Sequence, residues 1–414
     1  MARSTTFTYN VTVVNPGSGN KYYMDGILQT YVTLFPGCTY EFNQDDSSNS
    51  GHPLRFATQV DAANSSEYTT GVTTSGTPGS ATAWTKIEVT TSTPYRLFFY
   101  CTNHNGMGNS VTVPQGIATR AFTGGSYPSL TNTIEAVDLT TTGNTFDFGD
   151  MSATKYATGA IGGEIKGLLM GGSPDGGGTL LNTIDQIIIK SLGNSTDFGD
   201  LVAATNYPVG LGNQTRGING GGYISPSQTN NIGYVTIAAQ GNATDFGDLT
   251  VARNQFAGFA SPTRGVWAGG EVPGGRSDVL DYVTISSTGN ATDFGNLASA
   301  TGGTAGTSSS TRGIVAGGGT PSKINVIQYV TIASTGNATD FGDLTVAKSN
   351  MTLNGSNSTI GIFGGGLAPS TNVVIDSITF ASTGNAQDFG DMINSSNAGG
   401  YGQCGNSNGH GGLQ

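Results

Sequence analysis

Charged residues are scarce in this 414-residue sequence, and positively charged ones are scarcest. Asp, Glu, Lys and Arg make up 10% of the chain, with 16 Lys and Arg against 27 Asp and Glu and a net charge of −11. A nucleic-acid-binding surface needs clustered cations to neutralise phosphates, so we expect no nucleic-acid partner. The sequence also has no run of about 18 apolar residues, the length that spans a bilayer, so we expect no insertion into a membrane.

Cysteine is equally scarce. Cys38, Cys101 and Cys404 are too few for a framework of disulfides and leave at least one thiol unpaired, so we expect reduced thiols. Residues 1–7 lack the apolar segment of a signal peptide. We therefore expect a protein made in the cytoplasm and not exported by a signal-peptide route.

Motifs of the common enzyme classes are missing as well. The sequence shows no set of nucleophile, base and acid, no phosphate-binding loop, no dinucleotide fingerprint and no CxxC pair, and His410 lies in a Gly-rich tail. We therefore predict a non-enzymatic protein. One alternative stays open, because any two of the many Asp carboxylates could meet in the fold and hydrolyse glycosidic bonds.

Glycine, in contrast, is abundant. The chain contains 66 glycines, together with many Ser, Thr and Asn residues. This composition suits many short strands joined by tight turns, and it predicts an all-β protein.

A tripeptide, Asp-Phe-Gly, recurs six times at intervals of 47 to 50 residues. The copies begin at Asp147, Asp197, Asp245, Asp293, Asp340 and Asp388. Before each copy lies a turn such as Gly-Asn-Ala-Thr at 241–244, where Gly and Asn supply the positive φ of a hairpin. Each unit also carries an apolar stretch ending in a Gly pair, then a β-branched strand such as 234–237. Four strands in about 48 residues is the size of a propeller blade.

These units resemble those of kelch-type propellers, whose blades also have a Gly pair ending the second strand and a Tyr in the third. Phe stands here where kelch blades have Trp in the fourth strand, so the resemblance is one of architecture. It predicts a six-bladed β-propeller over residues 117–414. The first unit begins at its second strand, near 119–121, whereas residues 397–404 follow the last Asp-Phe-Gly at the offset of a first strand. We expect this C-terminal strand to complete the first blade and remove free sheet edges.

The six repeated aspartates raise the alternative of calcium, which binds clustered carboxylate oxygens. Their spacing distributes one or two carboxylates to each blade, so we favour aspartates that cap their own turns. A cation recurs with the same period, and we expect it to pair with these aspartates as part of the scaffold. It occupies Arg120, Lys166, Arg216, Arg264 and Arg312.

Residues 1–115 lie outside the repeat. Phe7, Tyr9, Val11 and Val13 alternate with polar residues, as a half-buried strand requires. The length of this region predicts a β-sandwich of about seven or eight strands.

The end of this region carries the chemically most suggestive segment. Cys101, His104 and Met107 follow a strongly apolar strand, and His52 is another of only three histidines. The region resembles the cupredoxins, and the Cys-x2-His-x2-Met spacing matches the shortest ligand loop of that family. The resemblance implies a type 1 copper site with His52, Cys101 and His104 as ligands and Met107 as a weak axial ligand.

Two features depart from the cupredoxin pattern. Pro53 follows His52 and lacks an N–H that could support the site by a hydrogen bond. In relatives with longer loops the axial Met stands at the position of Asn109, so Met107 could belong to a Gly-Met-Gly turn. A cupredoxin-like fold without obligatory metal, with Cys38 and Cys101 as ordinary buried thiols, therefore stays open.

Both regions together resemble structural proteins of tailed bacteriophages, particularly marine ones. The resemblance rests on the stretch from Thr39 through His52 and residues 53–56 to 101–104, and on the Gly-Asn-Ala-Thr-Asp-Phe-Gly-Asp-Leu repeats. It implies a virion protein made in the host cytoplasm, with other virion proteins as partners and with room for a homo-oligomer. We expect a tail fibre or tail-associated adhesin whose propeller binds a glycan or receptor on the host surface. The alternatives are a capsid decoration or head-fibre protein, and a copper-binding electron-transfer protein with the propeller as its docking module.

Overall fold

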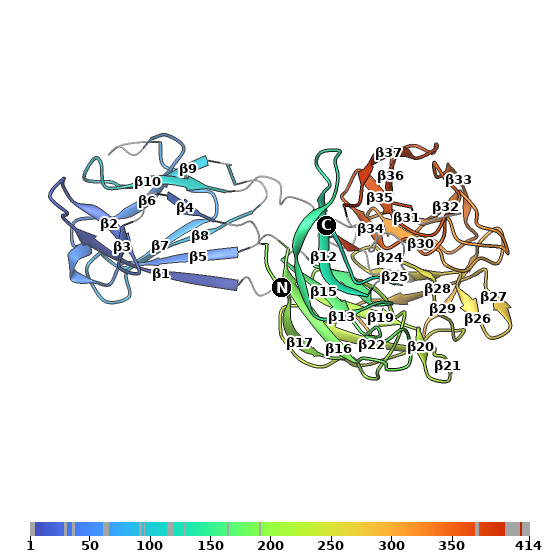
Figure 1. The fold of residues 1–414 in the computed structure, drawn as a ribbon. Coiled ribbons are helices and arrows are strands. Elements are labelled where there is room, and N and C mark those ends of the chain that lie inside the picture. The colour runs from blue at the N-terminus through green and yellow to red at the C-terminus, as the bar shows by residue number, and fades with distance from the viewer. Residues whose placement is uncertain are drawn as a thin grey trace. The chain divides into compact units, whose positions relative to one another are not determined.

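A computed structural model of the chain describes residues 5–28, 31–34, 38–60, 66–90, 93–94, 96–113, 120–127, 130–163, 165–189, 192–368, 372–393 and 406–407. The chain divides into two compact units, Met1–Ile117 and Ala118–Gln414. Both consist of β-strands, with one short 3-10 helix, η1 (Ser47–Asn49), in the first (Figure 1). No helix among the described residues is long and apolar enough to cross a membrane.

The first unit contains two sheets. A six-stranded mixed sheet has the order β3-β2-β1-β5-β8-β7, and a four-stranded sheet has the order β4-β10-β9-β6. The pairs β1–β5 and β4–β10 are parallel, and the other pairs are antiparallel. The strands are β1 Thr5–Val14, β2 Lys21–Met24, β3 Ile27–Leu28, β4 Tyr31–Thr33, β5 Cys38–Asn43, β6 Leu54–Ala57, β7 Val72–Ser75, β8 Trp84–Glu88, β9 Arg96–Cys101 and β10 Asn109–Thr112.

One hydrophobic core joins the two sheets of the first unit. Phe42 of β5 meets Phe56 of β6 edge to face, with ring centroids 5.4 Å apart, and both rings are fully buried. Cys38, Cys101 and Met107 belong to the same buried cluster. Burying each large apolar side chain contributes about 1.5–3 kcal/mol, so this core holds the segments that carry Cys101 and His52 in a fixed relation.

The second unit consists of six four-stranded antiparallel sheets, here called sheets 1 to 6 in chain order. Their strands are β11 Arg120–Gly124, β12 Thr131–Asp138, β13 Phe146–Lys155 and β38 Asn406–Ser407 (sheet 1); β14 Gly159–Gly162, β15 Lys166–Met170, β16 Thr183–Ile188 and β17 Thr196–Asp200 (sheet 2); β18 Val209–Gly212, β19 Arg216–Gly220, β22 Asn231–Thr236 and β23 Thr244–Asp248 (sheet 3); β24 Ala257–Ala260, β25 Arg264–Ala268, β28 Val279–Thr284 and β29 Thr292–Asn296 (sheet 4); β30 Ala305–Ser308, β31 Arg312–Ala316, β32 Val326–Thr331 and β33 Thr339–Asp343 (sheet 5); and β34 Leu353–Ser356, β35 Ile360–Gly364, β36 Val374–Thr379 and β37 Gln387–Asp391 (sheet 6). Two small hairpins, β20–β21 (Tyr223–Ile224, Ser227–Gln228) and β26–β27 (Glu271–Val272, Gly275–Arg276), extend sheets 3 and 4.

Sheet 1 takes its edge strand from the C-terminal end of the chain. Asn406 of β38 pairs with Phe122 of β11, and Ser407 pairs with Ala121. The segment 397–404, which we expected to make this pairing, lies outside the described residues, and the strand that pairs comes slightly later in the chain. β38 contacts both β34 of sheet 6 and β14 of sheet 2.

The Asp-Phe-Gly motif supplies the contacts between consecutive sheets. Its Phe is buried in all six copies. The Phe198 carbonyl accepts a hydrogen bond from the N–H of Gly241 in the following unit, and the Asp200 N–H donates to the Asn242 side chain at 3.0 Å. The same pair of bonds recurs from sheet to sheet and joins sheet 6 to sheet 1, where the Asp391 N–H donates to Asn144 at 3.0 Å. The repeated Gly-Asn turn is therefore an inter-sheet connector.

Among the described residues, the four periodic arginines and Lys166 form no ion pair with the repeated aspartates, so that expectation is wrong. Each guanidinium donates to a carbonyl beside the third strand of the next sheet, as Arg216 does to Ile285 at 2.8 Å. The same bond joins Arg120 to Ile189, Arg264 to Ile332 and Arg312 to Phe380. Arg216 also lies over the ring of Tyr234 in its own sheet, 4.4 Å from the centroid. The role is structural, as expected, but the partners are carbonyls and aromatic rings.

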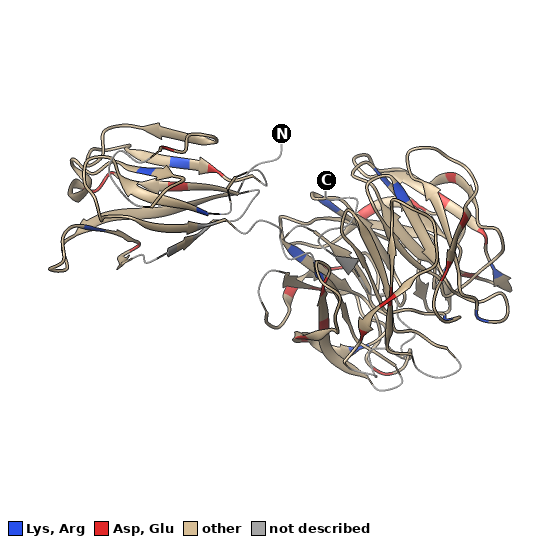
Figure 2. Ribbon diagram, turned by 90° about the horizontal axis from the view of Figure 1, so that it is seen from above, with Lys and Arg blue, Asp and Glu red and all other residues tan. Residues whose placement is uncertain are grey.

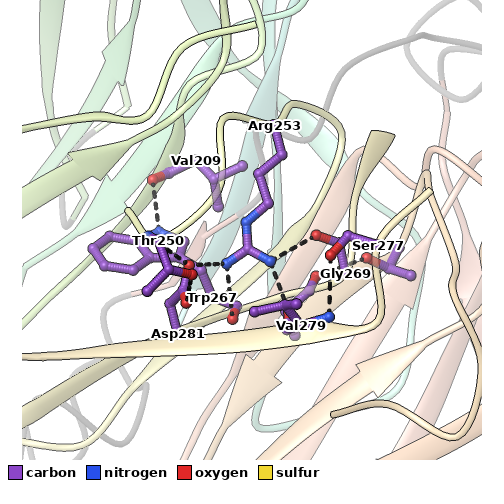
Figure 3. Close-up of polar contacts among 10 residues, drawn as sticks. Val209, Thr250, Arg253, Trp267, Gly269, Ser277, Val279 and Asp281 are labelled. Carbon is purple, nitrogen blue, oxygen red and sulfur yellow. Dashed lines mark hydrogen bonds and ion pairs between the residues drawn. The ribbon is translucent and has the colours of Figure 1, made fainter. Parts of the chain in front are cut away.

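Buried ion pairs occur in alternate sheets. They join Lys155 to Asp185 in sheet 2, Arg253 to Asp281 in sheet 4 and Lys348 to Asp376 in sheet 6, with N···O distances of 2.9, 2.7 and 2.8 Å. Arg253 and Lys348 lie in the segments that lead into sheets 4 and 6, whereas Lys155 is the last residue of β13 in sheet 1, and each carboxylate comes from the third strand of its sheet. The Arg253 guanidinium also donates to the carbonyls of Gly269 and Val279 (Figure 3). Burial lowers the pKa of Arg253 to about 10, so it stays charged at neutral pH.

Candidate metal centre

The four-stranded sheet of the first unit brings the two ligand-bearing segments together. Cys101 is the last residue of β9 and pairs across the sheet with Leu54, at the start of β6. The Thr102 N–H donates to the Pro53 carbonyl at 3.2 Å. His52, two residues before Leu54, therefore lies beside the loop that begins after Cys101. His52 and Cys101 are separated by 49 positions along the chain, so this register is what brings their side chains close.

Three of the four predicted ligands form one cluster. The ligand atoms of His52, Cys101 and His104 all lie within 4.8 Å of one another. The Cys101 sulfur is 3.8 Å from Nδ1 of His52 and 3.5 Å from Nδ1 of His104. The imidazole centroids are 4.5 Å apart, with the rings inclined at 45°. Both imidazoles thus present the same ring nitrogen to the same sulfur.

The cluster lies between the core and the solvent. The Cys101 side chain is fully buried, His52 is half-buried and His104 is exposed. Burial, and then the neighbouring His104, lower the pKa of His52 below its ordinary value. His52 is therefore neutral at pH 7, the state in which an imidazole nitrogen can bind a metal.

The hairpin β1–β2 supports both ligand segments. The Tyr22 hydroxyl donates to the His52 carbonyl at 2.9 Å, and the Tyr22 N–H donates to the Met107 carbonyl at 3.3 Å. Lys21 donates through its ammonium to the Gly106 carbonyl. The Asn20 side-chain amide lies 3.4 Å from Nε2 of His52, on the ring edge away from Cys101.

Further polar side chains hold the His52 loop. Gln44 donates to the His52 carbonyl at 3.0 Å, and Asn103 donates to the Gly51 carbonyl at 2.9 Å. These contacts do not need the N–H that Pro53 lacks. Contacts of this type orient ligand side chains in metal sites. Sequence reasoning missed Asn20, Tyr22 and Gln44, because nothing in their spacing connects them to His52.

Met107 is buried, 3% exposed, in the same hydrophobic cluster as Cys101. Its position between Gly106, with φ +74°, and Gly108 fits the turn that leads from the loop into β10. Burial beside Cys101 is compatible with either role foreseen for it, and its part as an axial ligand stays a prediction.

Chemically, the cluster suits a soft or borderline metal ion. A thiolate and two neutral imidazoles bind Cu(I), Cu(II) and Zn(II), whereas calcium prefers oxygen ligands. Within the described part of the chain, no second group of three His, Cys, Asp or Glu side chains brings its ligand atoms this close together. Among the described residues, the repeated aspartates therefore form no calcium site.

Comparison with known proteins adds no family to this description. No protein-family model matches the chain, and no curated protein matches it significantly.

Proposed function

We propose that the first unit is a cupredoxin-like domain in which His52, Cys101 and His104, together with Met107, would hold copper. The observation that carries the proposal is the convergence of Nδ1 of both imidazoles on the Cys101 sulfur, at 3.8 and 3.5 Å. Two imidazoles and a thiolate with a weak axial thioether form the donor set of blue copper sites.

Copper held by these ligands would supply one-electron transfer. The described residues would do the rest: Cys101 would bind as the thiolate after losing its proton, and His52 is already neutral because of its lowered pKa. His104 is exposed, so it would be the ligand that a redox partner can approach. The hydrogen bonds from Tyr22 and Gln44 hold the His52 loop in place.

Addition of Cu(II) to the purified full chain tests this function. We expect an intense visible absorption band from the Cys101 thiolate, which is lost in Cys101→Ser. Cys38→Ser is the matched control, because Cys38 is also a buried cysteine of the same core but lies outside the cluster. A wild-type protein that stays colourless and binds no copper would overturn the proposal.

For the second unit we propose a six-bladed β-propeller closed by β38. The inter-sheet bonds from Asp391 to Asn144, and the contacts of β38 with β34 and β14, support closure between sheets 6 and 1. Closure removes the free edges that an open row of sheets would expose.

A second candidate function is that of a non-enzymatic virion protein of a tailed phage, with the propeller as a host-binding adhesin on the tail. The specific observation is the division between constant and variable parts. The Gly-Asn connectors repeat in all six sheets, whereas the loops between second and third strands differ, as 173–179 does from 271–276. A rigid scaffold with variable loops suits recognition of a surface.

Localisation on purified virions by cryo-EM or immunogold labelling tests this second function. Label on the tail is the expected result, and label on the capsid would favour the decoration or head-fibre alternative. Absence from purified particles would overturn the virion role, while leaving the copper-binding test unaffected.

A further inference from the structure

We propose that a cleft between the loops of sheets 3, 4 and 5 binds a saccharide carrying an anionic group, a carboxylate or a sulfate. The inference deepens the proposed host-attachment role and rests on it for its biological meaning. The cleft has a volume of about 510 Å³. This is within the range of about 300–1,000 Å³ typical of small-ligand sites. Its lining includes Gln228, Glu271, Val272, Arg276, Thr320 and Pro321.

The cleft lies on the variable side of the second unit. Each sheet is an antiparallel meander. The loops between its second and third strands therefore lie at the same end as the segments that link one sheet to the next. Backbone pairing fixes this relation, because Asn254 bonds with Glu271 in both directions, at 3.1 and 2.8 Å. The Gly-Asn connectors, which repeat in every unit, lie at the opposite end. A ligand in the cleft therefore meets residues that are peculiar to sheets 3 to 5.

Arg276 is the residue that selects an anion. Its Nε lies 3.0 Å from a carboxylate oxygen of Glu271, and the two side chains are 31% and 32% exposed. This contact fixes the plane of the guanidinium and uses only one of its edges. The two terminal amino groups make no hydrogen bond to any residue that the structure describes. A planar fork with two free amino groups matches a carboxylate or sulfate bidentately.

Gly302 makes the placement of Glu271 possible. A Cβ at this position would clash with the Glu271 carboxylate. Gly302 forms an isolated β-bridge with Gly319 in the segment that leads into sheet 5. The equivalent positions before sheets 3 and 4 are Asn206 and Asn254, which form the same bridge with Tyr223 and Glu271 but carry side chains. Glu271 can therefore lie over the connector in this cleft and hold Arg276 from one side.

The remaining lining suits a sugar ring. Gln228 and Thr320 offer neutral groups for hydroxyls, while Val272 and Pro321 offer apolar surface for the C–H face of a pyranose. A nucleic acid is a poor candidate, because Lys and Arg are dispersed along the strands of the second unit rather than gathered in a stripe (Figure 2). A single fork in a small cleft fits one anionic group on a saccharide.

Isothermal titration of the full chain with three oligosaccharides, at low ionic strength, tests the proposal. The probes are an oligogalacturonate, a sulfated galactan oligosaccharide and a neutral galactan oligosaccharide of similar length. We expect one or both anionic probes to bind at least tenfold more tightly than the neutral one, and the two anionic arms distinguish a carboxylate from a sulfate. Binding of none of them at millimolar concentration, or equal binding of all three, would overturn the proposal.

Variants assign the binding to the cleft. Arg276→Gln should weaken anionic binding at least tenfold, and Arg276→Lys, which keeps the charge without the fork, should recover only part of it. Gly302→Ala should weaken binding through displacement of Glu271. Lys86→Gln is the matched control, because Lys86 is also 31% exposed and paired with a glutamate but lies in the first unit. Wild-type affinity in Arg276→Gln would show that the cleft is not the binding site, whether or not the protein is found on virions.

Discussion

The guanidinium of Arg253 and the carboxylate of Asp281 form an ion pair from which water is excluded, with Nη2 2.7 Å from Oδ2 and both side chains 0% exposed. The pair fastens the connector that leaves sheet 3 to the third strand of sheet 4 (Figure 3). Since removal of charges from water is costly, such a pair specifies one arrangement more than it adds net stability. Its recurrence in sheets 2 and 6 makes sheets 1 and 2, 3 and 4, and 5 and 6 three similar pairs.

Removal of one partner of this ion pair should therefore strongly lower the free energy of unfolding. We expect Arg253→Met to leave the Asp281 charge buried without a counter-charge and to lower the free energy of unfolding of the second unit by about 3–5 kcal/mol. Urea unfolding in a Trp84→Phe background measures this, because Trp267, fully buried beside Arg253, is then the sole fluorescent tryptophan. Arg276→Met, which breaks an exposed pair, should cost no more than about 1 kcal/mol. Equal losses in the two variants would contradict the buried role.

Tyr22→Phe tests the support of the metal centre. The variant removes only the hydroxyl that donates to the His52 carbonyl, so the absorption band should persist while copper affinity falls about tenfold. Competitive titration with a chelator of known affinity measures the change. Tyr23→Phe is the control, because its hydroxyl makes no hydrogen bond to the described residues. An unchanged affinity in Tyr22→Phe would show that the loop holds His52 without this bond.

The lowered pKa of His52 predicts a pH dependence of the metal-free protein. Its imidazole accepts a proton less readily in the folded state than at the ordinary value of 6.5, so the unfolded state binds more protons as the pH falls through that value. The free energy of unfolding of the first unit should decrease as the pH falls below about 6.5 and level off below the folded pKa. Thermal melting of wild type and His52→Asn between pH 7.5 and 5 measures the effect. A variant with the same slope as wild type would contradict the assignment to His52.

Much of the fold could be predicted from the period of one motif. Asp-Phe-Gly every 47 to 50 residues predicts units of four strands, and each of the six sheets contains one copy of the motif in an edge strand. The motif is recognisable in the sequence because every copy has the same local role, which is to bury its Phe at the edge of a sheet. The periodic arginines were misassigned because sequence spacing cannot distinguish a carboxylate from a carbonyl as partner. Their partners are backbone atoms nearly 70 residues away.

The candidate site was predictable only in its ligands. His52, Cys101 and His104 were identified by residue type and loop spacing, and the structure brings them together. Asn20, Tyr22 and Gln44 act through hydrogen bonds that depend on the cross-sheet register, which leaves no local signal. The buried cations do have a signal in the sequence. Lys155, Arg253 and Lys348 stand at the same offset after alternate Asp-Phe-Gly copies. Their partners became evident only when the third strands were aligned in space.

The bond between sheets 6 and 1 leads to a further prediction at Gly390, the glycine of the last Asp-Phe-Gly. Gly390 has φ +152°, and a Cβ there would clash with the Gly143 carbonyl of the connector in sheet 1. Gly384 has a similar φ of +158° but open space around it, so it is the matched control.

We expect Gly384→Ala to cost about 1–2 kcal/mol through backbone strain alone. Gly390→Ala should cost at least about 1 kcal/mol more, because Gly143 must also move and the hydrogen bond from its N–H to the Phe389 carbonyl weakens. Urea unfolding followed by Trp267 fluorescence, again in the Trp84→Phe background, compares the two variants. Equal losses would mean that sheets 6 and 1 are not held together by this contact, and the proposed closure of the propeller would lose its main support.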